Sequence, residues 1–282
     1  VWGGSNLQTA LGRSIPSGQP IGEAWEIVDR SEAQSVCLRT GKTLSQLMLQ
    51  SANQIMGPHW SSENRRFPIL VKWLDCEDRL SLQVHPPAHV AKKLNGEPKT
   101  ECWFIVEAKP NAKLFIGLKD GVSEQQFQET LLNSGGAGLT ALVHRTSVNT
   151  GESILLESGR IHAIDAGNLI LEIQQNSDTT YRVYDWDRVG LDGQPRQLHV
   201  DQSLQSIDFG DFEPVLTTSD FTSSVRVIAD CDVFRIRQVN LQAGESFDIT
   251  PGISPSIISV VHGDLEALNA NTGQSETVAR SE

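Results

Sequence analysis

The chain has 282 residues, which is long enough for one large domain or two smaller ones with separate cores. Its 35 acidic and 23 basic residues give a formal net charge of −12, and scattered basic residues argue against a nucleic-acid surface. No apolar run approaches the roughly 20 residues that a membrane-spanning helix needs, and the first residues do not resemble a signal peptide. We therefore expect a soluble, unexported, cytoplasmic protein.

Short β-like runs dominate the chain, and Gly, Asp, Asn or Pro bounds most of them. This pattern is typical of an antiparallel sandwich or barrel, so we predict a mainly β fold with a sandwich core. The clearest runs cover residues 67–74, 102–106, 153–156, 169–173 and 225–228.

Three helices are expected as insertions on this β scaffold. Residues 43–56 carry apolar side chains at helical spacing, and residues 88–94 fit a short helix. Ser123 and Gln126 match a capping box, and Gly135 and Gly136 would stop that helix near residue 134. The helix near residues 123–134 should lie at the surface.

The sequence turns polar and aperiodic around residues 201–219, where we place a domain boundary. We expect a larger domain over residues 1–205 and a smaller C-terminal β unit over residues 206–282. Because the tail ends in polar residues, this second unit should be small or truncated.

The four cysteines are widely spaced and form no CxxC pair. Reduced thiols in the cytosol are the simplest interpretation. Cys102 follows Glu101 directly, but adjacent side chains on a strand face opposite ways, so we interpret Cys102 as core packing.

Gln83 and His85 are the most informative residues of the chain. Residues i and i+2 of a strand point to the same face, so an amide oxygen and an imidazole would lie side by side. Glu101 and His162 would complete a set of four ligands. Oxygen and imidazole donors suit a divalent cation such as zinc, and a coordination position left to water or substrate would make the site catalytic.

The run Gly151-(x5)-Glu157-x-Gly159-(x2)-His162 resembles the second signature motif of the cupin superfamily. Together with Gln83-x-His85 and Lys99-Thr100-Glu101, it makes the chain resemble the type I mannose-6-phosphate isomerase family in its shorter bacterial form. The resemblance covers about the first two-thirds of the chain, and it is carried further by Trp2-Gly3-Gly4, Gly22–Glu26, Leu80–Pro86 and Ser177–Arg182.

That resemblance implies a cupin-type jelly roll that interconverts mannose 6-phosphate and fructose 6-phosphate through an enediol. It also implies one Zn²⁺ per chain, held by Gln83, His85, Glu101 and His162. The expected partner is a small sugar phosphate, and the oligomeric state is left open.

The resemblance places Glu172, Asp178 and Arg182 in the pocket. Glu172 is our candidate base because an enclosed carboxylate has a raised pKa unless a cation sits nearby. Alternatives for the base are Lys99, Asp178 and a zinc-bound hydroxide, and Glu172 could instead face solvent. Arg182 suits a phosphate or a developing enediolate, or else a salt bridge to Asp178, Asp185 or Asp187.

Lys72 interrupts a strongly apolar run, and a buried lysine usually has a partner. By the resemblance, Lys72 and Ser81 lie at the phosphate end of the pocket. Lys99 would hold sugar hydroxyls or the leaving proton. Glu23 would line the pocket, with a surface loop carboxylate as the alternative.

Two other functions compete with the isomerase. An iron-dependent cupin oxygenase would consume O₂, but the Gln ligand argues against an iron site. A non-catalytic sugar-phosphate sensor would bind ligand without turnover, which the retained Lys72, Lys99, Glu172 and Arg182 make less attractive.

Overall fold

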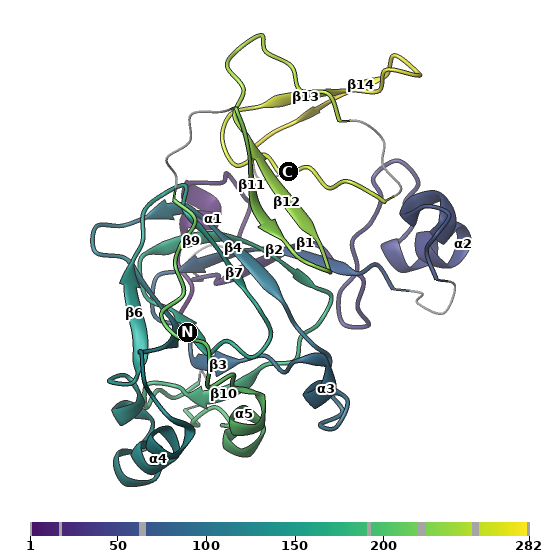
Figure 1. Ribbon diagram of the computed structural model, residues 1–282. Coiled ribbons are helices and arrows are strands. Elements are labelled where there is room, and N and C mark those ends of the chain that lie inside the picture. The colour runs from purple at the N-terminus through teal and green to yellow at the C-terminus, as the bar shows by residue number, and fades with distance from the viewer. Residues whose placement is uncertain are drawn as a thin grey trace.

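Two five-stranded antiparallel sheets face each other in the computed structural model, which describes residues 2–16, 19–61, 66–190, 193–218, 224–249 and 254–280 (Figure 1). Across the first sheet the order is β1 (Glu23–Ile27), β2 (Ile69–Cys76), β9 (Asn168–Gln175), β4 (Glu101–Ala108) and β7 (Ser153–Leu156). Across the second sheet it is β10 (Tyr181–Tyr184), β3 (Leu82–Val84), β8 (His162–Ile164), β5 (Lys113–Leu118) and β6 (Val143–Ser147). The predicted mainly β sandwich is confirmed.

The period-two alternation of each strand decides which side chains enter the sandwich. Leu74, Trp103 and Ile170 of the first sheet share one buried cluster with Ile116 and Ile164 of the second. Their neighbours in sequence point the other way. The interior of the sandwich is therefore apolar at one end, and the polar side chains of the candidate site lie at the other end.

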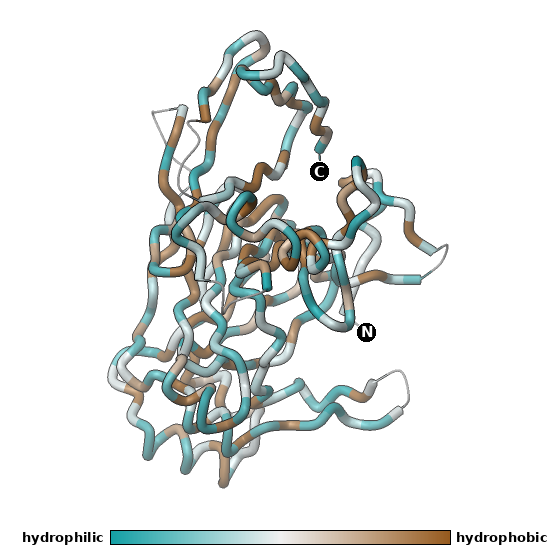
Figure 2. The backbone as a smooth tube through the Cα atoms, turned by 90° about the vertical axis from the view of Figure 1, so that its right-hand side faces the viewer, coloured by the Kyte–Doolittle hydropathy of each residue, from teal (hydrophilic) through white to brown (hydrophobic). Residues whose placement is uncertain are grey.

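Helices and a hairpin cover the outer faces of the sheets. Residues of α1 (Asn6–Thr9) and α2 (Leu44–Met56) pack on the first sheet together with Ile228. Residues of α4 (Glu124–Leu139) and α5 (Val200–Ser206) lie against the second sheet. Figure 2 shows hydrophobic segments concentrated in the middle of the molecule, whereas the protruding loops are mainly hydrophilic. Both faces of each sheet are thus buried in places.

The C-terminal region forms two hairpins beyond the sandwich (Figure 1). They are β11 (Val225–Asp230) with β12 (Arg235–Val239), and β13 (Leu265–Leu268) with β14 (Ser275–Val278). The proposed division at residues 205 and 206 stays a prediction. The polar, aperiodic segment that begins near residue 201 starts within a helix, because α5 runs to Ser206. Its Ser203 and Ser206 hydroxyls donate back to the carbonyls of His199 and Gln202.

The predicted helices are present, with two corrected ends. Thr43 caps α2 in a full capping box with Gln46. Ser123 accepts a hydrogen bond from the Gln126 backbone at the start of α4, but the helix does not stop at residue 134. It bends at Gly135, whose φ of 63° breaks the helical pattern, and resumes to Leu139 because that side chain is fully buried. The third helix, α3, covers Ala88–Ala91 and ends before the predicted residue 94.

Within the described part of the chain, none of the helices has the length and apolar content that crossing a bilayer requires.

Candidate metal centre

Two rows of inward-facing residues meet at the polar end of the sandwich. On the first sheet, strand register aligns Lys72 with Glu172 and Glu172 with Trp103. On the second sheet, it aligns Gln83 with both Arg182 and His162. Side chains far apart in sequence are brought together because each row runs across the strands, perpendicular to the chain direction.

Three of the four predicted ligands form a buried cluster. Ligand atoms of His85, Glu101 and His162 lie within 4.8 Å of one another, and all three residues are at most 2% exposed. Each imidazole directs Nδ1 to a backbone carbonyl: His85 lies 2.9 Å from the oxygen of Thr179, and His162 lies 2.8 Å from that of Arg160. These contacts fit an Nδ1–H donor, which leaves both Nε2 lone pairs directed at the Glu101 carboxylate.

The protonation states of this cluster favour a cation. Burial lowers the pKa of His85 to about 4, with Lys99 adding to the effect, and burial likewise lowers the pKa of His162. Burial alone would raise the pKa of Glu101, but Lys99 and His85 hold it well below its usual value. His85 Nε2 lies 3.3 Å from one carboxylate oxygen and His162 Nε2 lies 3.5 Å from the other. The lone pairs of the two Nε2 atoms therefore face those of the Glu101 carboxylate. Two imidazole nitrogens and a carboxylate are ligands that fit a divalent cation.

Gln83 lies beside this cluster with its amide nitrogen 3.4 Å from His162 Nε2. Its amide oxygen accepts a hydrogen bond from the hydroxyl of Ser81 at 3.1 Å. Turning the amide by 180° would direct the oxygen toward the cluster and offer the nitrogen to Ser81, whose hydroxyl can also accept. The predicted fourth ligand is thus positioned to bind through its oxygen.

Alternating charges extend from the cluster toward the rim of the site. The ammonium of Lys99 lies 2.7 Å from Glu101 and 3.3 Å from Glu172. Lys72 lies 3.4 Å from the same Glu172 oxygen and 3.3 Å from Glu23. The carboxylates Glu172 and Glu23 outweigh the effect of burial and raise the pKa of Lys72. Each of the two lysines therefore contacts two carboxylates, and Glu172 contacts both lysines.

Glu23, at the outer end of this network of ion pairs, is more exposed to solvent than the other members. The Glu23 side chain is 40% exposed and accepts a hydrogen bond from the Trp25 indole at 3.0 Å. Burial would raise the pKa of Glu23, but Lys72 and Trp25 lower it overall. Glu23 therefore contacts the charged network from the rim, and it is not an isolated surface carboxylate.

Glu172 does not face solvent, contrary to the alternative raised from its strand. It is 2% exposed, and its second oxygen accepts a hydrogen bond from the Trp103 indole at 3.1 Å. Sequence reasoning did not identify Trp103 as part of the site. Its spacing of two residues from Glu101 on the same strand is the signal that could have found it.

Arg182 lies on β10 beside the metal-ligand row. Its Nε donates to Ser81 at 3.3 Å and one terminal nitrogen donates to the Gln197 carbonyl at 2.9 Å. Asp185, a proposed alternative partner, pairs with Arg188 and Arg196 instead. Arg182 is thus held by neutral groups.

Asp178 does not lie among the buried residues of the site. It is exposed on the loop that precedes β10, whereas its neighbour Ser177 is buried.

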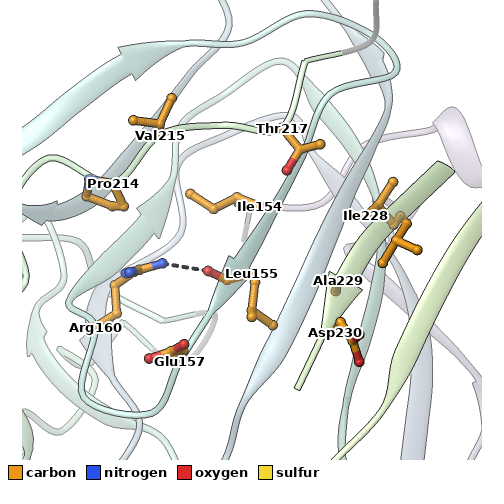
Figure 3. Close-up of a pocket in the computed structure, with 11 residues that line it drawn as sticks. Ile154, Leu155, Glu157, Arg160, Pro214, Val215, Thr217, Ile228, Ala229 and Asp230 are labelled. Carbon is orange, nitrogen blue, oxygen red and sulfur yellow. Dashed lines mark hydrogen bonds between the residues drawn. The ribbon is translucent and has the colours of Figure 1, made fainter. Parts of the chain in front are cut away.

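A separate groove of about 490 Å³ lies at the outer edge of β7 against β11 (Figure 3). Arg160 borders it and donates to the Leu155 carbonyl. None of the predicted site residues lines this groove.

Comparisons with known proteins agree with the geometry. Residues 1–101 match the model of the phosphomannose isomerase type I catalytic domain. The chain is 38% identical over 222 residues to the probable mannose-6-phosphate isomerase GmuF of Bacillus subtilis, covering 77% of this chain and 68% of that protein. It is 34% identical over 280 residues to mannose-6-phosphate isomerase ManA of the same organism, covering 94% and 82%.

Solved structures give the same result. The crystal structure of mannose 6-phosphate isomerase from Bacillus subtilis superposes with a TM-score of 0.79 at 29% identity, covering 100% of this chain and 88% of that one. The apo enzyme from Salmonella typhimurium shares the fold, with a TM-score of 0.77 at 18% identity over 100% and 90% of the two chains. From the identity and coverage of its relatives, the chain belongs to the type I phosphomannose isomerase family.

Proposed function

We propose that the protein is a metal-dependent aldose-ketose isomerase that interconverts mannose 6-phosphate and fructose 6-phosphate. The observation that carries the proposal is the convergence of His85, Glu101 and His162 beside a charged network that contains Glu172. The relatives GmuF and ManA are named as mannose-6-phosphate isomerases, and their substrate is transferred to this chain on that basis.

We propose Zn²⁺, one per chain, as the metal. Two imidazoles, one carboxylate and one amide oxygen would hold it through His85, His162, Glu101 and Gln83. Zinc accepts nitrogen and oxygen ligands of this kind. When bound, it would polarise the carbonyl and enediol oxygens of the open-chain sugar.

Glu172 is the proposed base. It would take the proton from one of the two carbons, C1 or C2, and return it to the other, while a hydroxyl proton moves between O2 and O1, so that no net proton is gained or lost. Two ammonium groups and an indole N–H contact its carboxylate and fix the side chain. Glu172 is therefore not the enclosed carboxylate without a nearby cation that the sequence suggested, and the proposal rests on its position beside the cluster. Lys99 remains an alternative, and the exposure of Asp178 weakens its case as a base or substrate ligand.

Arg182, Lys72 and Ser81 are the proposed anion-binding groups. Around the site, three cationic side chains balance three carboxylates: Lys72, Lys99 and Arg182 against Glu23, Glu101 and Glu172. A divalent cation would leave a surplus of two positive charges, which matches the charge of about −1.5 to −2 on a phosphate monoester. The balance therefore favours a phosphorylated sugar over a neutral one.

The test is a coupled assay that follows fructose 6-phosphate formation from mannose 6-phosphate, with metal content measured on the same sample. Activity should disappear after chelation and return with Zn²⁺. Full activity in metal-free protein would reject the mechanism. Oxygen consumption with a preference for iron, or tight sugar-phosphate binding without turnover, would favour the two competing functions.

Glu172→Gln tests the base. We expect a loss in kcat of about 10²- to 10⁴-fold with unchanged metal content, because the amide keeps the shape but cannot take a proton. Asp178→Asn is the matched control and should remain close to wild type. If kcat fell further in Asp178→Asn than in Glu172→Gln, Asp178 would be the base instead of Glu172.

The cytoplasmic location expected from the reduced cysteines stays a prediction, and all four cysteines are free.

A further inference from the structure

Arg182 lies on the outermost strand of the second sheet, where one side of the backbone has no neighbouring strand. β3 is the neighbour of β10 within the sheet, and Arg182 stands opposite Gln83. In an antiparallel ladder, the N–H and C=O of one residue point to the same side. Both of these groups of Arg182 point away from β3, to the side where a sheet edge is normally left unpaired.

His199 occupies that side. Its backbone N–H donates to the Arg182 carbonyl at 2.8 Å, and the Arg182 N–H donates to its Nδ1 at 3.3 Å. The imidazole nitrogen thus takes the place that a carbonyl of a neighbouring strand would occupy. Burial and the charge of Arg182 lower the pKa of His199, which keeps Nδ1 available as an acceptor.

His199 is itself fixed by the helix that follows it. The Ser203 hydroxyl donates to the His199 carbonyl at 2.7 Å, and the Ser203 backbone N–H donates to the same carbonyl at 2.8 Å. Ser203 is fully buried, and the His199 ring lies 6.1 Å from that of Tyr181. The first turn of α5 therefore holds the imidazole against β10.

The same segment also holds the side chain of Arg182. The Gln197 carbonyl accepts from one end of the guanidinium, and Ser81 accepts from Nε. Backbone and side chain of Arg182 are consequently fixed by residues two positions apart in sequence, and Ser81 connects the guanidinium to the amide of Gln83.

We propose that His199 is a positioning residue that fixes Arg182 at the substrate site by replacing the missing neighbour of β10. For its effect on turnover, the inference rests on the proposed function, in which Arg182 binds the anionic substrate. His199 would contact neither substrate nor metal. It would act only through the backbone of Arg182.

Three variants test this. His199→Ala removes the acceptor, and His199→Asn restores one because its amide oxygen lies as far from Cβ as Nδ1 does. The exposed His262→Ala is the control for loss of a histidine elsewhere. Each is measured for hydrogen exchange at the Arg182 amide, kcat and KM on mannose 6-phosphate, metal content and thermal unfolding.

We expect His199→Ala to speed exchange at the Arg182 amide and to lower kcat/KM, each about tenfold, as the loss of one hydrogen bond implies. Metal content should not change. His199→Asn should recover most of both effects, and His262→Ala should match wild type. If His199→Ala does not fold, His199→Asn compared with His199→Gln, whose oxygen lies one bond too far, tests the same position.

Unchanged exchange in His199→Ala would overturn the inference, as would equal losses in the Ala and Asn variants. Inactivity of the wild-type protein would instead count against the proposed function, because the exchange measurement does not depend on turnover.

Discussion

The two inner faces that form the site differ in how their charges are balanced. On the first sheet, Lys72 pairs with Glu172 and Glu23, and Lys99 pairs with Glu172 and Glu101. The second sheet contributes neutral donor atoms, such as His162 Nε2, which face the carboxylate of Glu101 without a proton between them. The charged groups of the first face pair with one another, whereas the imidazoles of the site have no such partner without a cation, and Glu101 contacts both sets.

Glu101→Ala should therefore have the largest effect. It removes one of four protein ligands and leaves Lys99 buried beside fewer negative charges. We expect metal and activity to be lost together, with kcat/KM falling on the order of 10³-fold or more. Glu107→Ala is the control, because Glu107 lies at the exposed end of the same strand. Retention of metal in Glu101→Ala would show that the two faces do not share this residue.

Arg182→Ala should separate substrate binding from metal binding. Since Arg182 contacts Ser81 and the Gln197 carbonyl, its loss should leave the metal in place and lower kcat/KM by about 10²- to 10³-fold. Elemental analysis and the isomerase assay check this, with Arg145→Ala as the control on the same sheet. Metal loss as severe as in Glu101→Ala would mean that Arg182 is misplaced.

Lowering the pH should destabilise the metal-free protein through its buried histidines. In metal-free protein the pKa of His85 is about 4, below the value of about 6.5 in unfolded chains, so the unfolded state binds more protons between these values. The free energy of unfolding should therefore fall as pH drops from about 6.5 to 4, by roughly 1–3 kcal/mol. Urea unfolding of chelated protein across this range measures it. In His85→Gln the slope should shrink, and an unchanged slope would assign it to other groups.

Trp103→Phe should have the smallest effect on turnover. It removes the indole hydrogen bond to Glu172 while keeping an aromatic ring beside His162, where the indole now packs edge-on at 5.3 Å. We expect kcat to fall about tenfold at constant metal content, as one hydrogen bond to a charged group implies. Loss of metal in this variant would show that Trp103 supports the ligands instead.

Short-range regularities predicted much of the site. The two-residue period placed Gln83 and His85 on one face, and the structure brings His85 together with Glu101 and His162. The role of Gln83 and the grouping of all four came from the family resemblance, because glutamine is an uncommon ligand. The same period would have added Trp103.

Contacts between residues far apart in sequence could not be predicted from the two-residue period of a strand. Nothing local in the sequence indicates that the imidazole of His199 pairs with a strand 17 residues earlier. The polar sequence of α5 does not predict a helix, because its serines form hydrogen bonds with the backbone of the same helix. The helix end that we predicted near Gly135 is a bend within α4. Each of these depends on what packs against the segment.

The sheet register has a consequence for how the protein folds. Gln83 and His162 are separated by 79 residues, and Ser81 and Arg182 by 101, yet both pairs meet in the site. Pairings this distant form late, after many chain segments have lost their freedom. The ligands are therefore apart while the chain searches for its fold, so a cation would not speed folding. It would slow unfolding, and its effect would appear as a longer lifetime of the folded state.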